Sequence, residues 1–126
     1  MKVANQPFNT FTLTNAEGAS VDAGVAVGPD GAIFVASADG AQLAGVNKFE
    51  TDDGKAMTVQ TGMVPVLLGG PVSAGDRLTI GDGTGIFTAA AADEPWYAVA
   101  QEAGVDTDLI EAFVMPLVSG TMAPAP

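Results

Sequence analysis

The feature that most constrains the fold of this chain is a hairpin-like stretch that occurs twice. Residues 72–91 read VSAGDRLTIGDGTGIFTAAA, and residues 21–36 read VDAGVAVGPDGAIFVA. Both copies begin with Val-x-Ala-Gly, continue with alternating apolar residues, turn at Gly and Asp, and resume with Ile-Phe. Apolar alternation on both sides of a short Gly/Asp turn is typical of a β-hairpin. The sequence therefore predicts two related β units.

The spacing of the shared landmarks sets the expected length of each unit. Gly24 precedes Gly75 by 51 residues, whereas Phe34 precedes Phe87 by 53, so the second copy contains two extra residues. An insertion of two residues in a strand leaves every side chain on its original face. Further along, residues 63–66 resemble residues 114–117, again at a spacing of 51. We expect the two units to span roughly residues 19–68 and 70–118.

Length and composition predict one small domain with an all-β fold. A chain of 126 residues is long enough for one shared core but not for two independent ones. Its 16 glycines and 8 prolines interrupt it too often for long helices. We expect a small antiparallel β-barrel or sandwich, built from the two related units, over residues 10–118. An extended N-terminal arm over residues 1–9 and an extended C-terminal tail over residues 119–126 complete the expected organisation.

Alternation and turn residues predict where the strands lie. Residues 63–68 are apolar throughout, so they are either buried on both faces or covered by a partner. Pro65 within them indicates a sheet edge or a strand boundary. Residues 98–103 have helical propensity, but the repeat favours a strand there. The predicted strands are residues 10–14, 43–49, 57–61, 63–68, 97–100 and 109–118.

Charge limits the partners that the chain can bind. Four Lys/Arg against fifteen Asp/Glu give a net charge of −11, and the four cations are scattered along the sequence. Direct binding of nucleic acid or of an anionic membrane needs clustered cations, so neither is expected. The acidic surface also keeps an apolar-rich chain soluble. The sequence contains neither an apolar run long enough to span a membrane nor a signal-peptide pattern, so we expect synthesis and use without export.

The residues needed for most catalysis are absent. The chain contains no His and no Cys, which removes Ser-His-Asp and Cys-His catalysis, disulfides, and zinc sites built on these residues. Nearly all acids lie at predicted turns, where Asp is favoured for local hydrogen bonding. Residues 81–85 read GDGTG but are flanked by strands, so they indicate a hairpin turn rather than a phosphate loop. We expect no enzyme activity and no cofactor. Acidic clusters at residues 50–53 and 106–108 leave calcium binding open.

The repeat resembles the small capsid decoration, or cement, proteins of tailed bacteriophages. The resemblance is carried by residues 21–24, 72–75, 85–90 and 59–62, and covers about residues 10–118. It implies a structural virion protein that is made in the host cytoplasm and binds the outer face of an assembled head. There it would stabilise contacts between subunits of the major capsid protein, commonly as a homotrimer.

The resemblance also implies two kinds of contact residues. The N-terminal arm would lie on the capsid and use apolar anchors, although an ordinary chain end followed by a first strand is an equal alternative. The subunit interface would use large apolar residues, which are at least as well suited to the core of one domain. The candidate arm residues are Val3, Phe8, Phe11 and Leu13, and the candidate interface residues are Met63, Val64, Val66, Trp96 and Tyr97.

Two other functions fit the same sequence. A β-barrel that binds a ligand such as a carbohydrate would need an aromatic platform, and the eight aromatic residues of this chain are dispersed. A subunit of another assembly, such as a phage tail or a surface layer, would use similar strands and a similar arm.

Overall fold

The computed structural model describes residues 10–35, 42–81 and 83–115. The regular structure of these residues consists of β-strands, as predicted, and none of them forms a helix long and apolar enough to cross a membrane. The strands are β1 (Thr10–Thr14), β2 (Ala26–Val27), β3 (Gly45–Asn47), β4 (Ala56–Gln60), β5 (Gly62–Leu67), β6 (Arg77–Ile80), β7 (Phe87–Ala89), β8 (Ala98–Ala100) and β9 (Leu109–Val114).

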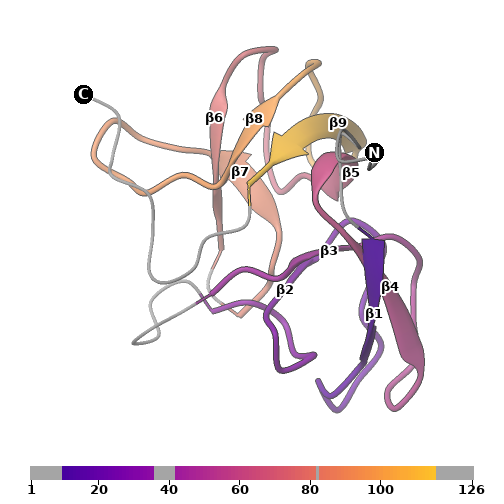
Figure 1. The fold of residues 1–126 in the computed structure, drawn as a ribbon. Coiled ribbons are helices and arrows are strands. Elements are labelled where there is room, and N and C mark those ends of the chain that lie inside the picture. The colour runs from indigo at the N-terminus through magenta and orange to yellow at the C-terminus, as the bar shows by residue number, and fades with distance from the viewer. Residues whose placement is uncertain (1–9, 36–41, 82, 116–126) are drawn as a thin grey trace, which may run out of the picture.

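The strands form two antiparallel sheets. The first sheet has the order β1-β4-β3-β2, and the second has the order β5-β9-β8-β6-β7. Figure 1 shows the first sheet in indigo to magenta in the lower part of the view and most of the second sheet above it. Neither sheet closes on itself, so of the two expected architectures the sandwich is present and the barrel is not.

The two sheets share one pairing scheme. In each, the first strand along the chain pairs with the last, the last pairs with the strand that precedes it in sequence, and that strand pairs with the second. The register is also shared, because each sheet contains a row of four residues that are Cα partners from strand to strand and that match when the two units are aligned. These rows are Thr10, Gln60, Val46 and Ala26 in the first sheet, and Met63, Phe113, Val99 and Arg77 in the second.

The repeated Val-x-Ala-Gly motif makes equivalent contacts in both copies. Each motif valine forms an isolated antiparallel bridge to the loop before the last strand of its unit. Each motif glycine has a positive φ, +85° at Gly24 and +91° at Gly75. Each also donates its backbone N–H to the carbonyl at the end of the second-last strand of its sheet, to Asn47 of β3 and to Ala100 of β8. The sequence repeat therefore corresponds to a repeat in backbone conformation.

The boundary between the sheets lies earlier than the expected boundary at residues 68–70. β4 belongs to the first sheet and β5 to the second, so Thr61 alone separates them. β5 is accordingly the counterpart of β1 and not of Val114 and Met115, while residues 116–117 of the expected match lie outside the described residues. β5 lies at the edge of its sheet, as Pro65 predicted, because proline lacks the N–H that a second neighbouring strand would need.

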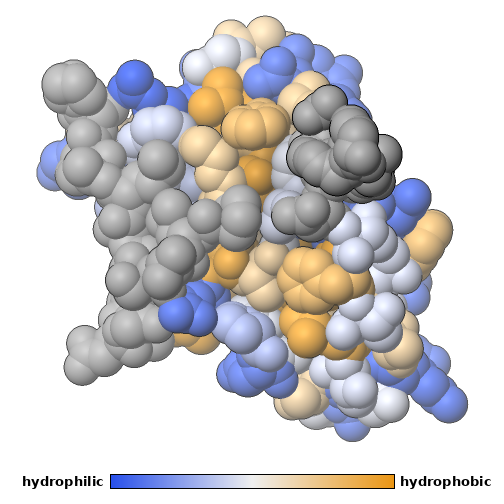
Figure 2. Space-filling view, viewed as in Figure 1, coloured by the Kyte–Doolittle hydropathy of each residue, from blue (hydrophilic) through white to orange (hydrophobic). Residues whose placement is uncertain are grey.

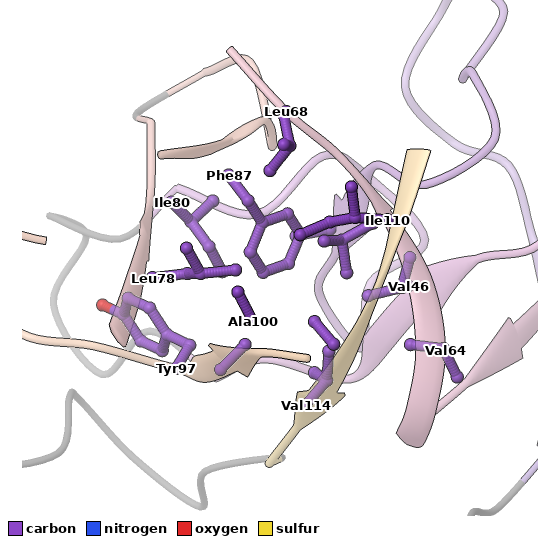
Figure 3. Packing of buried hydrophobic residues seen from close by; sticks show 14 of the residues in the cluster. Val46, Val64, Leu68, Leu78, Ile80, Phe87, Tyr97, Ala100, Ile110 and Val114 are labelled. Carbon is purple, nitrogen blue, oxygen red and sulfur yellow. The ribbon is translucent and has the colours of Figure 1, made fainter. Parts of the chain in front are cut away.

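The buried apolar residues form a main cluster and a smaller one. The main cluster joins the inner face of the second sheet to Ala26, Phe34, Leu43 and Val46 of the first unit. Figure 3 shows Phe87 near the middle of this cluster, with Val46 contributed by the first sheet. The smaller cluster consists of Val21, Val25, Val27, Met57 and Val59. The expected single core is therefore one shared cluster with a second cluster confined largely to the first unit.

Backbone hydrogen bonds also join the two units. The N–H of Leu67 donates to the carbonyl of Gly24 at 2.9 Å, and the N–H of Ala26 donates to the carbonyl of Gly85 at 2.9 Å. Both bonds connect residues from different sheets or from the loops between their strands. Because buried backbone groups are costly to leave unpaired, these bonds help to fix how the sheets meet.

Candidate functional site

The acidic side chains act mainly within turns. Several carboxylates of the described residues accept hydrogen bonds from nearby backbone N–H groups, as predicted for Asp at turns. No group of three acidic residues close enough to hold a metal ion occurs in the described ranges. The accepting residues include Asp30, Asp53, Asp76 and Asp108 at 2.9–3.1 Å.

The glycine-rich segment at residues 81–85 forms the turn of a β-hairpin. β6 and β7 pair antiparallel on either side of it, and the N–H of Gly81 donates to the carbonyl of Ile86 at 2.9 Å. A phosphate loop opens a helix, whereas this segment ends in a strand. Asp82 lies outside the described residues.

The candidate arm residues divide into two groups. Val3 and Phe8 lie outside the described residues. Phe11 and Leu13 lie in β1, which pairs along its whole length with β4. Leu13 packs against the smaller buried cluster, so it is engaged within the chain. Phe11 is 38% exposed and remains available for contact with another molecule.

Three of the candidate interface residues are core residues. Val64 and Val66 point into the main cluster, and Tyr97 is fully buried with its ring edge-on to Phe34 at 5.4 Å. Their apolar side chains are covered by the chain itself, which corresponds to the core role that the sequence offered as the alternative. Met63 is the exception among these strand residues, because alternate side chains of β5 point to opposite faces.

Trp96 occupies an intermediate position. Its side chain is half-buried, and the guanidinium of Arg77 lies 5.1 Å from the centre of its ring. This distance is within the range of a cation–π contact. The contact ties the loop before β8 to β6, which gives Trp96 a role within the domain.

Apolar side chains gather on the outer face of β5 and β9, which we call the β5–β9 face. Its outward side chains are Met63, Pro65, Leu109, Glu111 and Phe113. Met63 is the cross-strand partner of Phe113, and Pro65 is the partner of Glu111. The solvent face of an antiparallel sheet normally carries polar side chains, so this composition is unusual.

The same position in the first sheet is polar. The exposed side chains of β1 include Thr10, Thr12 and Thr14, and Thr12 is the cross-strand partner of the half-buried Thr58. Hydroxyl side chains suit a solvated strand. The related sheets therefore differ in how their surfaces meet solvent.

A small apolar pocket adjoins the β5–β9 face. It has a volume of about 130 Å³, and Pro65 and Leu109 belong both to the pocket and to the face. Phe49 and Lys48 lie at its other side, with the Lys48 ammonium 5.4 Å from the Phe49 ring centre. The pocket lies where the first unit meets the second, because Ala23, Gly24 and Val46 of the first unit also line it.

Sequence reasoning identified Met63 on this surface but missed Phe49, Leu109 and Phe113. Phe49 is 57% exposed and Leu109 is 52% exposed. On the side seen in Figure 2, hydrophobic side chains gather in a band down the middle of the molecule. The large exposed apolar residues among those described are Phe11, Val35, Phe49, Met63, Val105, Leu109 and Phe113.

Comparison with known proteins yields a match in structure. No model of a known protein family matches the sequence, and no curated protein matches it. A solved structure that it resembles is described as the head fiber gp8.5 N base in bacteriophage phi29. The match has a TM-score of 0.62 at 20% sequence identity and covers 91% of this chain and 98% of that chain. The fold of this chain is therefore similar to that of this solved structure.

Proposed function

We propose that this chain is a structural protein of a bacteriophage virion that binds the outer surface of the head. In this proposal it contacts the major capsid protein, stabilises contacts between capsid subunits, and assembles as a homotrimer. The observation that carries the proposal is the fold that it shares, over nearly the whole of both chains, with the base of a head fiber. The resemblance of its repeat to cement proteins supports it independently.

The physical character of the described residues supports an adhesive role. Their acidic side chains are used in turns, and four of their large exposed apolar side chains lie on strands that the sheets hold rigid, namely Phe11, Met63, Leu109 and Phe113. A rigid surface can bind without the entropic cost of ordering a loop. Many weak contacts repeated over a head can together give firm attachment.

Head binding can be tested by sedimentation. Heads are purified from a phage in which the gene for this chain has been deleted, mixed with the purified chain, and centrifuged through a density gradient. We expect the chain to sediment with the heads at a fixed ratio to the major capsid protein. Failure to bind at saturating concentration would contradict the proposal. Binding instead to isolated tails, or to sugars on a glycan array, would support one of the two alternative functions.

Two variants test the proposed capsid contacts. A chain that lacks residues 1–9 should bind heads more weakly while its far-UV circular dichroism stays unchanged. Loss of circular dichroism would show that these residues belong to the folded domain. Phe11→Asp should also weaken head binding, because it places a charge at an exposed apolar side chain of the first sheet. Thr12→Asp, on the same strand, is the matched control for the added charge.

A further inference from the structure

We propose that the β5–β9 face, together with the pocket beside it, is the surface through which copies of this chain contact one another. The inference rests on the oligomeric part of the proposed function and names the surface that would carry it. It does not depend on whether the partner of the oligomer is a capsid.

The described residues leave this apolar face uncovered. Met63 and Phe113 form a cross-strand pair, and they are 38% and 40% exposed. Val99 of β8 extends this row because it is the other partner of Phe113. The first sheet presents threonines where its strands meet solvent. A contiguous apolar surface on a folded protein marks a contact with another molecule.

The face carries both a projecting aromatic side chain and a pocket of the size that such a side chain fills. The Phe113 side chain projects from β9, and the pocket opens beside Leu109 on the same strand. The pocket volume of about 130 Å³ is close to the ~150 Å³ of a protein cavity that accepts a benzene ring. One aromatic side chain of a neighbouring copy would therefore fill it. A surface that carries both parts can contact another copy of itself, in a closed ring or across a two-fold axis.

The distribution of charge also favours this face as the contact between copies. Two copies that each carry −11 repel one another, so they can approach only where few acids lie. The β5–β9 face carries Glu111, the Glu102 carboxylate lies beside it at 2.8 Å from the Glu111 backbone nitrogen, and the pocket carries Lys48. The Lys48 ammonium of one copy can therefore pair with a carboxylate of another when two copies meet. A partner with a strongly basic surface would instead be drawn to the acidic turns.

The size of the face sets the expected strength of the contact. Six-residue strands with neighbours about 4.8 Å apart give a face of roughly 20 Å by 15 Å. Stable interfaces bury about 800 Å² on each partner, so this contact belongs to the weak class. We therefore expect association at protein concentrations of roughly 10 µM to 1 mM rather than at nanomolar concentrations.

The test compares two phenylalanines of nearly equal exposure. Sedimentation velocity over the concentration range above measures the assembled mass of the wild-type chain, of Phe113→Asp and of Phe11→Asp, against the 12.6 kDa of one chain. We expect the wild type and Phe11→Asp to associate, and Phe113→Asp to associate at least about tenfold more weakly. Ala23→Phe, which fills the pocket without altering β5 or β9, should weaken association in the same way.

Each outcome decides the inference. A wild-type chain that stays monomeric over the whole range would overturn it, and so would equal association of the two Phe→Asp variants. Circular dichroism shows whether Phe113→Asp folds, and the milder Phe113→Ala replaces it if it does not. The proposed function fails separately: a chain that associates through this face but does not bind heads would refute head binding alone. A Phe113→Asp monomer that still binds heads, with lower avidity, would support both.

Discussion

Replacing Gly24 by alanine tests the junction between the two sheets, and Gly75 supplies the matched control. Both glycines have the same place in the repeat and nearly the same φ. A Cβ added at Gly75 meets no atom within 4 Å. At Gly24 it would lie against the Leu109 side chain and 2.6 Å from the backbone nitrogen of Leu67. That nitrogen also donates to the Gly24 carbonyl.

The difference between the two variants can be worked out from these contacts. Gly75→Ala should cost about 1 kcal/mol, because an L residue is strained at positive φ. Gly24→Ala has the same strain and adds overpacking of about 1–3 kcal/mol. It also weakens a backbone hydrogen bond worth about 1 kcal/mol. We expect Gly24→Ala to lower the free energy of unfolding by about 3 kcal/mol more than Gly75→Ala, or roughly 10 °C in Tm.

Urea denaturation measures this difference, and two probes make it informative. Far-UV circular dichroism follows both sheets, whereas the fluorescence of Trp96, the only tryptophan, follows the second unit. Because Gly24 belongs to the first unit, coincident transitions by both probes would show that the sheets unfold together. Equal destabilisation by the two alanines would refute the close approach of Gly24 to β5 and β9.

Three other perturbations have defined outcomes. Tyr97→Ala should lower the free energy of unfolding by about 3–5 kcal/mol, because it empties a fully buried site against Phe34. A loss below about 1 kcal/mol in urea denaturation would place the Tyr97 ring outside the core. Thr107 has a φ of +72°, and its counterpart in the first unit, Gly54, has a φ of +81°. A threonine is strained at such an angle, so Thr107→Gly should raise the free energy of unfolding by about 1 kcal/mol. A decrease in Tm would contradict this strain. Adding calcium or a chelator should leave Tm unchanged, because the described acids form no cluster of metal ligands. A Tm that rises with calcium concentration would reveal a calcium site.

The sequence predicts the strands of this domain well because their alternation and turns are local properties. Residues 57–61 alternate apolar and polar side chains, and β4 forms there with Met57 and Val59 buried. The repeat likewise predicts the shared motif, because a positive φ at Gly24 and Gly75 depends on residues close in sequence. The proline in β5 correctly indicates an edge strand.

The sequence could not assign the faces of β9 or the boundary between the sheets. Both alternating sets of β9 contain large apolar residues, so periodicity alone does not decide whether Phe113 or Val114 points inward. Tertiary packing decides it, since the smaller Ala112 fits the inner face. The boundary was missed because Thr61 connects β4 to β5 without a turn signal, whereas residues 69–71, GGP, resemble one.

The pairing of first and last strands has a practical consequence for engineering. Thr10 is the partner of Gln60, Gly62 is the partner of Val114, and one residue joins the two pairs. With neighbouring Cα atoms about 4–6 Å apart across each pair, Thr10 and Val114 lie within roughly 20 Å. Peptides fused before Thr10 or after Met115 would therefore leave the domain from the same end. A circular permutant that links Met115 to Thr10 and opens the chain at the exposed Gly54 turn would retain every strand pair.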